Sequence, residues 1–315
     1  MISRRSILTA MGVAVCVQKA GGQAAGDAVR VVIDTDTANG IDDQFALAYA
    51  LRAPDVMSVE AIYAAPFVTD SAPDPSQGTQ ASYEEIQRVL DRLGRSDFQQ
   101  VYKGATSFMK APWQPVDSPA ARDLIERATP GPTRLYVIAI GAATNVSSAF
   151  LLDPSIRDRI NVIWLGGQPY DGPNAREYNL EQDVHASRVL FESSVRLVNV
   201  PVNGVSDKLT VTADELQAAL QGKSRIGDYL CEIFADRSRQ HNPSAVLTSK
   251  TIWDLAAVAY LINPGWVKST MVSSPILNSD FTWSQDTNRH GVRVATEVNR
   301  DAIFADFFER IAGAD

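Results

Sequence analysis

The feature that most constrains the fold is a regular alternation of two kinds of segment along most of the chain. From residue 28 onward, short strand-like apolar runs alternate with segments whose apolar residues recur at helical spacing. The runs at residues 135–140 and 162–165 are continuously apolar, which is typical of strands buried on both faces of a sheet. The alternation therefore predicts an α/β fold with an open, mostly parallel, Rossmann-like sheet flanked by helices.

The positions of these segments give a set of expected elements. Strands are expected at residues 29–33, 59–64, 135–140, 162–165 and 195–201, and helices at residues 43–52, 83–93, 145–152 and 252–262. Residues 66–80 contain three prolines and form the longest expected loop. Loops after parallel strands are where such folds bind ligands. No long linker breaks the chain, so residues 28–315 are expected to form a single domain.

The first 25 residues have the composition of an export signal. Arg4 and Arg5 precede an apolar run at residues 7–17 and a stretch of small residues at 20–26. The arginine pair resembles a twin-arginine signal, which indicates export and a periplasmic location. The alternative is an unstructured start in which the pair is accidental. Cys16 invites a lipoprotein interpretation, although Val15 is a poor match to the small residue that such sites prefer.

Charge and cysteine content exclude several other classes. The formal net charge is −8 and no run of Lys or Arg forms a basic stripe, which argues against a nucleic-acid polymer as partner. The apolar run at residues 7–17 is too short to span a bilayer, and no membrane span is expected in the mature chain. Removal of the signal would leave Cys231 as the remaining cysteine, more often a packing residue than a nucleophile.

An aspartate-rich turn directly follows the first expected strand. Asp34 and Asp36 end the strand, and Asp42 and Asp43 open the next helix. A helix N-terminus favours some negative charge, but carboxylates at this density would repel one another or become protonated. A hard divalent cation would neutralise them, and ligation by oxygen alone suits Ca²⁺ or Mg²⁺.

The turn also has three other interpretations. Aspartates can cap a helix in water, which is common for one or two of them. An EF-hand loop would need a preceding helix and a glycine one place before Gly40. A haloacid-dehalogenase-type phosphatase also places an Asp-x-Asp motif after a strand, but Ala38 does not match its fifth position.

The segment from Ile33 to Leu47 resembles the N-terminal signature of the inosine–uridine-preferring nucleoside hydrolase family. That signature usually reads Asp-x-Asp-Pro-Gly-x-Asp-Asp, and here residues 37–41 form a longer replacement for Pro-Gly-x. The resemblance implies that Asp36 binds the metal and acts as the base. It also implies that Asp42 binds ribose and that Asp43 is a metal ligand.

Two later segments resemble further motifs of the same family. Residues 141–145 resemble its Gly-x-x-Thr-Asn, which implies that Thr144 offers a backbone carbonyl to calcium. Residues 177–179 resemble its Glu-Phe-Asn, which implies that Glu177 and Asn179 bind ribose hydroxyls. The family has a further Asn before this Glu, for which Asp171 and Asn174 are both candidates.

The last motif, Trp253-Asp254, departs from the best-known branch, which has His-Asp. The resemblance keeps Asp254 as a metal ligand. Trp253 cannot protonate the leaving base as a histidine would, but members specific for purines also carry Trp-Asp, with the indole stacked on the base. Core packing is the alternative for Trp253. Phe67 follows the second strand, where the family has Gly-Asn, and could wall the base pocket.

The resemblance implies the nucleoside hydrolase fold and hydrolysis of ribonucleosides, with purine nucleosides as the expected substrates. Ribose and the free base would be released by a calcium-bound water, with Asp36 as its base. The family also implies a homodimer or homotetramer. Two alternatives stay open: a nucleoside- or ribose-binding protein without turnover, and the phosphatase. Leaving-group activation is unassigned, since His241 is expected on a loop and His185 and His290 belong to no motif.

Overall fold

The computed structural model describes residues 28–129, 131, 133–241 and 248–313. The expected export signal and Cys16 lie outside these ranges. Within the described ranges, no helix combines the length and the apolar composition needed to cross a bilayer.

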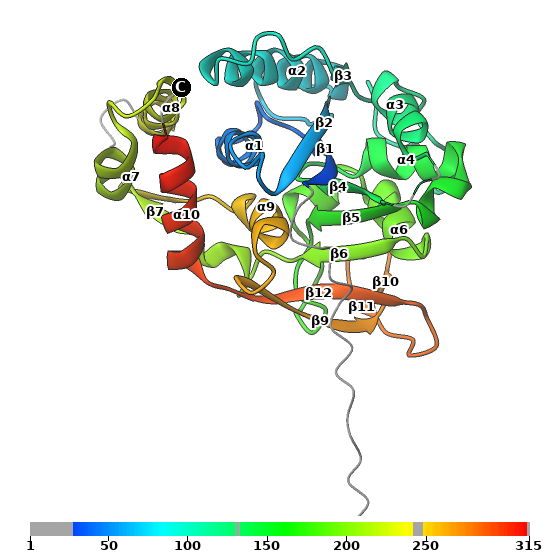
Figure 1. Ribbon diagram of the computed structural model, residues 1–315. Coiled ribbons are helices and arrows are strands. Elements are labelled where there is room, and N and C mark those ends of the chain that lie inside the picture. The colour runs from blue at the N-terminus through cyan, green and yellow to red at the C-terminus, as the bar shows by residue number, and fades with distance from the viewer. Residues whose placement is uncertain (1–27, 130, 132, 242–247, 314–315) are drawn as a thin grey trace, which may run out of the picture.

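An eight-stranded sheet runs through the centre of the molecule (Figure 1). Its order is β3-β2-β1-β4-β5-β6-β12-β9, and every neighbouring pair is parallel except β12 with β9. The strands are β1 (Val29–Thr35), β2 (Met57–Ala64), β3 (Val101–Lys103), β4 (Leu135–Ala139), β5 (Ile160–Leu165), β6 (Arg196–Val200), β9 (Val267–Ser273) and β12 (Gly291–Val298). The expected open, mostly parallel sheet is confirmed.

The strand order reverses beside β1. The chain first adds β2 and β3 on one side of β1, then returns to place β4, β5 and β6 on the other. The carboxyl ends of β1 and β4 are therefore neighbours, and the crevice between them is a topological switch point, where open α/β sheets bind ligands. The aspartate-rich turn leaves β1 at this crevice.

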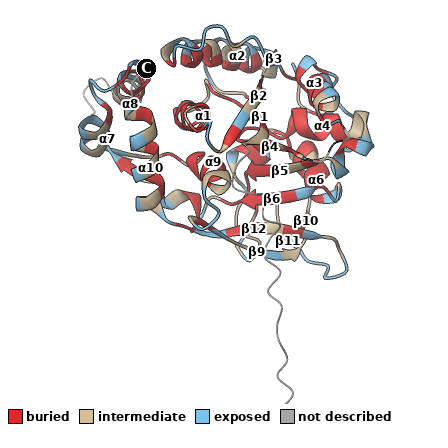
Figure 2. Cartoon of the chain, viewed as in Figure 1, coloured by how far each residue is buried: buried red, intermediate tan, exposed pale blue. Residues whose placement is uncertain are grey.

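Helices cover both faces of the sheet because neighbouring residues of a strand point to opposite sides. In β1, Val31 and Ile33 join one buried apolar cluster, while Val32 joins the other. The first cluster includes residues of α1 (Asp42–Leu51), α2 (Pro75–Arg92), α7 (Ala213–Leu220), α8 (Arg225–His241), α9 (Leu255–Ile262) and α10 (Arg300–Ala312). The second includes residues of α3 (Pro119–Arg127), α4 (Thr144–Leu152) and α6 (Val184–Glu192). Figure 2 shows the central strands buried between the two layers.

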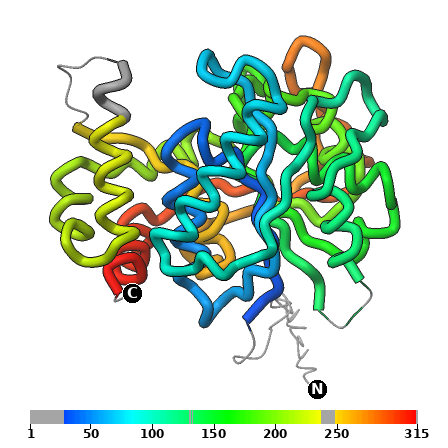
Figure 3. Tube along the Cα trace, turned by 90° about the horizontal axis from the view of Figure 1, so that it is seen from above, coloured from blue at the N-terminus to red at the C-terminus, as the bar shows by residue number. Residues whose placement is uncertain are grey.

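The view from above separates these two groups of helices. In Figure 3 the amino-terminal segment (blue) lies in the middle, with α7 and α8 (yellow-green) on one side and the green chain that carries α4 on the other. Two short pairings complete the structure: β7 (Thr210–Thr212) with β8 (Ser249–Thr251), and β10 (Ile276–Leu277) with β11 (Trp283–Ser284).

The expected strands and helices are all present, with three differences. The loop expected at residues 66–80 is shorter because α2 begins at Pro75, where the Asp74 carboxylate accepts hydrogen bonds from the amides of Ser76 and Gln77. The helix expected from residue 252 begins at Leu255, so Trp253 and Asp254 lie in the turn before it. His241, expected on a loop, is the last residue of α8.

Candidate functional site

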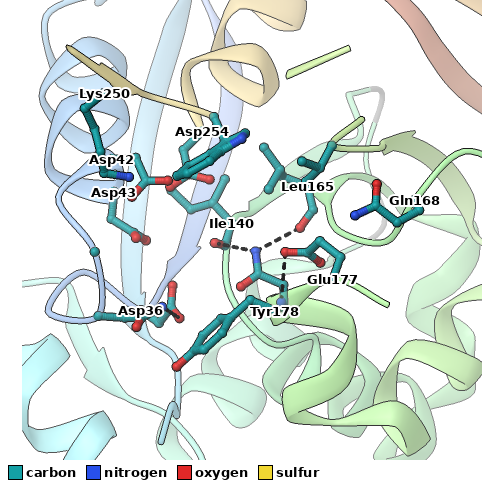
Figure 4. A pocket seen from close by; sticks show the side chains of 15 residues that line it. Asp36, Asp42, Asp43, Ile140, Leu165, Gln168, Glu177, Tyr178, Lys250 and Asp254 are labelled. Atoms are coloured by element: carbon teal, nitrogen blue, oxygen red, sulfur yellow. Dashed lines mark hydrogen bonds between the residues drawn. The ribbon is translucent and has the colours of Figure 1, made fainter. Parts of the chain in front are cut away.

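A cavity of about 410 Å³ lies at the carboxyl ends of the central strands (Figure 4). Residues after β1, β4 and β5 form its floor and walls, and the turn before α9 closes one side. The lining residues are Asp36, Asn39, Gly40, Asp42, Asp43, Ile140, Leu165, Gln168, Glu177, Tyr178, Asn179, Val202, Lys250, Trp253 and Asp254. The cavity thus occupies the switch point that the strand order creates.

Three carboxylates converge in this cavity. One oxygen from each of Asp42, Asp43 and Asp254 lies within 4.8 Å of the others, and Asp43 and Asp254 are buried. The Thr35 hydroxyl donates to Asp43, which fixes that carboxylate at the start of α1. Asp36 also lines the cavity and accepts a hydrogen bond of 3.1 Å from the Asn39 amide.

Burial and mutual repulsion raise the pKa values of these acids. Burial, reinforced by the charge of Asp42, raises the pKa of Asp43 to about 7. The pKa values of Asp36 and Asp254 lie well above the ordinary range, first because of burial and then because of the neighbouring aspartates. A bound cation would reverse this destabilisation of the charged forms. The donors are all oxygens, so the residues fit a hard divalent cation such as Ca²⁺ or Mg²⁺.

Glu177 and Asn179 form a rigid polar wall facing these acids. Glu177 precedes α5 (Tyr178–Gln182), and its carboxylate accepts hydrogen bonds from the amides of Gly167, Asn179 and Leu180. The Asn179 amide group donates to the carbonyls of Ile140 and Leu165, at 3.0 and 3.1 Å, and so joins the ends of β4 and β5. Burial raises the pKa of Glu177 to about 7 even though these amides lower it.

Trp253 lies between the apolar core and the cavity. Its ring packs against the first apolar cluster and also lines the cavity, so both interpretations of this residue have a basis in the geometry. The indole Nε1 is buried without a hydrogen-bond partner. The Lys250 Nζ lies 4.0 Å from the centroid of the ring.

Three candidates from the sequence do not reach the cavity. Thr144 is fully buried at the start of α4, where its hydroxyl donates to Asp183. Ile140 lines the cavity instead, because it is the first residue after β4, which ends at Ala139, and so lies at the carboxyl end of that strand. Phe67 is a core residue with 1% exposure, and the Asn174 side chain accepts a hydrogen bond from the Arg176 amide outside the cavity.

The remaining candidates also lie elsewhere. Asp34 is fully buried, accepts a hydrogen bond from the Asn145 side chain and does not line the cavity. Asp171 lines a separate cavity beside β9 and β12. Neither His185 nor His290, the two histidines whose side chains are described, contributes to the walls.

Several lining residues were not anticipated from the sequence. Asn39 and Gly40 belong to the longer loop at residues 37–41, whose sequence shows only a departure from the family motif. A Cβ atom at Gly40 would lie 2.4 Å from an oxygen of Asp42, so the loop passes directly against that carboxylate. Four others carried no motif signal: Leu165, Gln168, Val202 and Lys250. Tyr178 lay within the Glu-Tyr-Asn motif without an assigned role.

Comparisons with known proteins converge on one family. The family model for inosine-uridine preferring nucleoside hydrolase matches residues 31–305. "Probable uridine nucleosidase 2" of Arabidopsis thaliana is 26% identical over 232 residues, covering 67% of this chain and 70% of the relative. "Non-specific ribonucleoside hydrolase RihC" of Escherichia coli is 27% identical over 259 residues, covering 75% and 80%.

Solved structures share the fold. A plant nucleoside hydrolase structure, titled the PpNRh1 enzyme, aligns with a TM-score of 0.73 at 21% identity, covering 91% of this chain and all of that one. A purine-preferring ribonucleoside hydrolase from Gardnerella vaginalis aligns with a TM-score of 0.71 at 22% identity, covering 90% and 98%. The nucleoside hydrolase fold expected from the sequence is confirmed by these alignments.

Proposed function

Because the chain belongs to the inosine-uridine preferring nucleoside hydrolase family, an enzyme family that hydrolyses ribonucleosides, we propose that it cleaves the N-glycosidic bond of purine ribonucleosides. The products would be ribose and the free base. One observation carries the proposal: a cluster of buried carboxylates faces the Glu177–Asn179 wall across one cavity at the switch point of the sheet.

Calcium is the proposed cofactor. Asp43 and Asp254 are assigned to it by both the family pattern and the convergence of their oxygens, and Asp42 belongs to the same cluster. Asp36 would join them, since it lines the same cavity, and its pKa is raised first by burial and then by the charge of Asp43. Ile140 lines the cavity whereas Thr144 does not, so its carbonyl, which accepts a hydrogen bond from Asn179, would take the place expected for that of Thr144. When bound, the cation would supply positive charge that acidifies a nearby water and holds ribose hydroxyls.

The protein's own side chains would orient the sugar and the water. The Glu177 carboxylate is held by three backbone amides, so its remaining lone pairs can accept hydrogen bonds from ribose hydroxyls in a fixed direction. Asp42 would accept from another hydroxyl. Asp36, held by Asn39, would take the proton of the attacking water. The surrounding carboxylates also favour the positive charge that develops on the sugar as the bond breaks.

Trp253 supports the choice of purine nucleosides. An indole in the cavity wall offers a flat aromatic surface on which a two-ring base can stack. Relatives carry names of both kinds, uridine nucleosidase and purine-preferring hydrolase, so the preference rests on this residue.

Binding without turnover is the second candidate, and it is favoured by the lack of a histidine with a described side chain in the cavity wall. The phosphatase is not supported, because its nucleophile would be Asp34, which is buried away from the cavity. Incubating the protein with inosine, adenosine and uridine, followed by an assay for free ribose, separates the first two. We expect ribose release in calcium and none from Asp36→Asn, whereas tight binding without ribose would establish the second.

A further inference from the structure

The proposed reaction needs a group that neutralises the leaving base, and none has been assigned so far. When the C1′–N bond breaks, the bonding electrons stay on the base, which must be neutralised by a proton or a nearby positive charge. The indole N–H of Trp253 is far too weakly acidic to supply that proton. His185 and His290 lie away from the cavity. Among the side chains that the structure describes, the group that serves the base is therefore sought in another residue of the wall.

Lys250 has the chemistry and the position for this task. It is the one cationic side chain among the lining residues that the structure describes. It belongs to β8, which pairs with β7, so its backbone is held in register rather than on a free loop. Figure 4 shows its amine end turned into the cavity, toward the part where Asp42 lies.

The contacts of Lys250 place its amine beside the proposed base site. Nζ lies 4.0 Å from the centre of the Trp253 ring and donates to the Thr251 carbonyl at 3.4 Å. Asp42 and Glu177, the two carboxylates that the proposed function assigns to ribose, lie on opposite sides of the cavity in Figure 4, and Lys250 lies on the Asp42 side. A base held against Trp253 would therefore lie within reach of an ammonium group on a flexible four-carbon stem.

We propose that Lys250 is a catalytic residue that contacts the departing base and protonates one of its ring nitrogens. This inference rests on the proposed function. The C1′–N bond breaks with its electron pair moving to the base, and the water oxygen forms the new bond to C1′. The proton of the water passes to Asp36, and a proton from Nζ passes to the base. Asp36 then returns its proton to solvent and Lys250 regains one, so nucleoside and water give ribose and neutral base.

A purely electrostatic role makes a different prediction. In that role, Lys250 would only offset the negative charge of the acidic cluster and so stabilise the folded protein before substrate binds. In that case its removal would disturb the sugar site and lower the hydrolysis of every riboside equally, whatever the leaving group. The two roles can therefore be distinguished with two substrates that share the ribose, of which only one has a leaving group that needs a proton.

The experiment compares inosine with 4-nitrophenyl riboside, whose phenolate leaves without protonation. In Lys250→Met, which keeps the stem without the charge, we expect kcat/KM for inosine to fall about 100-fold or more. Hydrolysis of the nitrophenyl riboside should stay close to the wild-type rate. Lys268→Met is the matched control, because Lys268 is an exposed lysine that pairs with Glu297 and does not line the cavity, so both activities should be unchanged.

Calcium content and melting temperature are measured for each variant, with Lys250→Gln as a second substitution if Lys250→Met does not fold. Equal losses on both substrates, or no loss on inosine, would overturn the assignment while leaving the proposed function intact. A wild-type protein that hydrolyses neither substrate would contradict the proposed function, and the assignment of Lys250 with it.

Discussion

Asp43 and Asp254 show how strongly metal binding at this site should depend on single carboxylates. Asp43 and Asp254 are buried, lie beside one another and have raised pKa values, so each is a costly residue without a cation. We expect Asp43→Ala and Asp254→Ala each to abolish calcium binding, measured by elemental analysis after gel filtration. Asp70→Ala, at an exposed loop position outside this cavity, is the control that should keep the metal. The absence of any divalent metal from the wild-type protein would refute the assignment.

Trp253 is the residue on which the base preference depends. Loss of stacking on one base costs about 1–3 kcal/mol, so Trp253→Ala should lower kcat/KM for inosine and adenosine by about 10- to 100-fold. The loss on uridine should be smaller, because a single ring overlaps the indole less. Trp113→Ala, which removes a tryptophan that is 57% exposed, serves as the control. Equal losses on inosine and uridine would assign Trp253 to packing alone.

At the scale of elements, the loop at residues 37–41 stands out because it is longer than the family motif and forms part of the cavity wall. The Asn39 amide nitrogen closes a turn on the Asp36 carbonyl at 2.8 Å, and its side chain holds the Asp36 carboxylate. Gly40 then passes against Asp42. The loop therefore orients aspartates on both of its sides, although no side chain within it is charged.

This packing predicts the effect of one added methyl group. In Gly40→Ala, the new Cβ would lie 2.4 Å from the Asp42 oxygen and must displace that carboxylate or the loop. We expect KM for nucleosides to rise several-fold while the melting temperature changes little, since Gly40 itself is not part of the apolar core that holds its neighbour Ile41. Gly131→Ala tests a glycine that has free space around it and no positive φ, and it should leave KM unchanged. An unaltered KM in Gly40→Ala would show that Asp42 does not hold the substrate.

The elements also show what the sequence could predict and why it stopped there. β1 and β4 were predictable because the residues that each strand buries on both faces of the sheet form an apolar run. The antiparallel edge strand β9 was not, since most of its residues are partly or fully exposed and leave no apolar run. The acidic side chains named by the motifs and the Glu177–Asn179 wall line the same cavity. The motifs did not indicate Ile140, because its place in the cavity wall depends on where β4 ends and not on its residue type.

At the scale of the whole molecule, the two ends of the described chain are built into one core. The Phe307 ring of α10 lies 5.7 Å from the Phe45 ring of α1 and 5.5 Å from the Tyr49 ring, and the Tyr49 hydroxyl donates to Asp306. β12 also pairs with β6 inside the sheet. We therefore propose that residues 28–315 unfold as a single domain.

Calorimetry tests this proposal. A single cooperative transition is expected, and Phe307→Ala should destabilise it by about 3–5 kcal/mol because a buried ring is removed from the shared core. Met271→Ala, which truncates a side chain that is 58% exposed on edge strand β9, should have little effect. Two separate transitions, with Phe307→Ala shifting only one of them, would contradict the single domain.

The acidic cavity should also make the stability of the whole chain depend on pH and calcium together. Asp43 and Glu177 have pKa values of about 7 in the folded protein, against ordinary values of about 4 in the unfolded chain. Between these values the folded state binds more protons, so the free energy of unfolding falls as pH rises through this window. The penalty is complete above pH 7, where both carboxylates are charged and buried.

Calcium should remove much of this penalty because it binds the charged form of its ligands. Without calcium, the melting temperature is expected to fall between pH 5 and pH 8, and added calcium should raise it more at pH 8 than at pH 5. Asp43→Asn keeps the shape of the side chain without its charge, so the variant should lose most of the calcium response and part of the pH dependence. A calcium-free protein that melts higher at pH 8 than at pH 5, or an equal calcium shift at both, would mean that these buried carboxylates do not control stability.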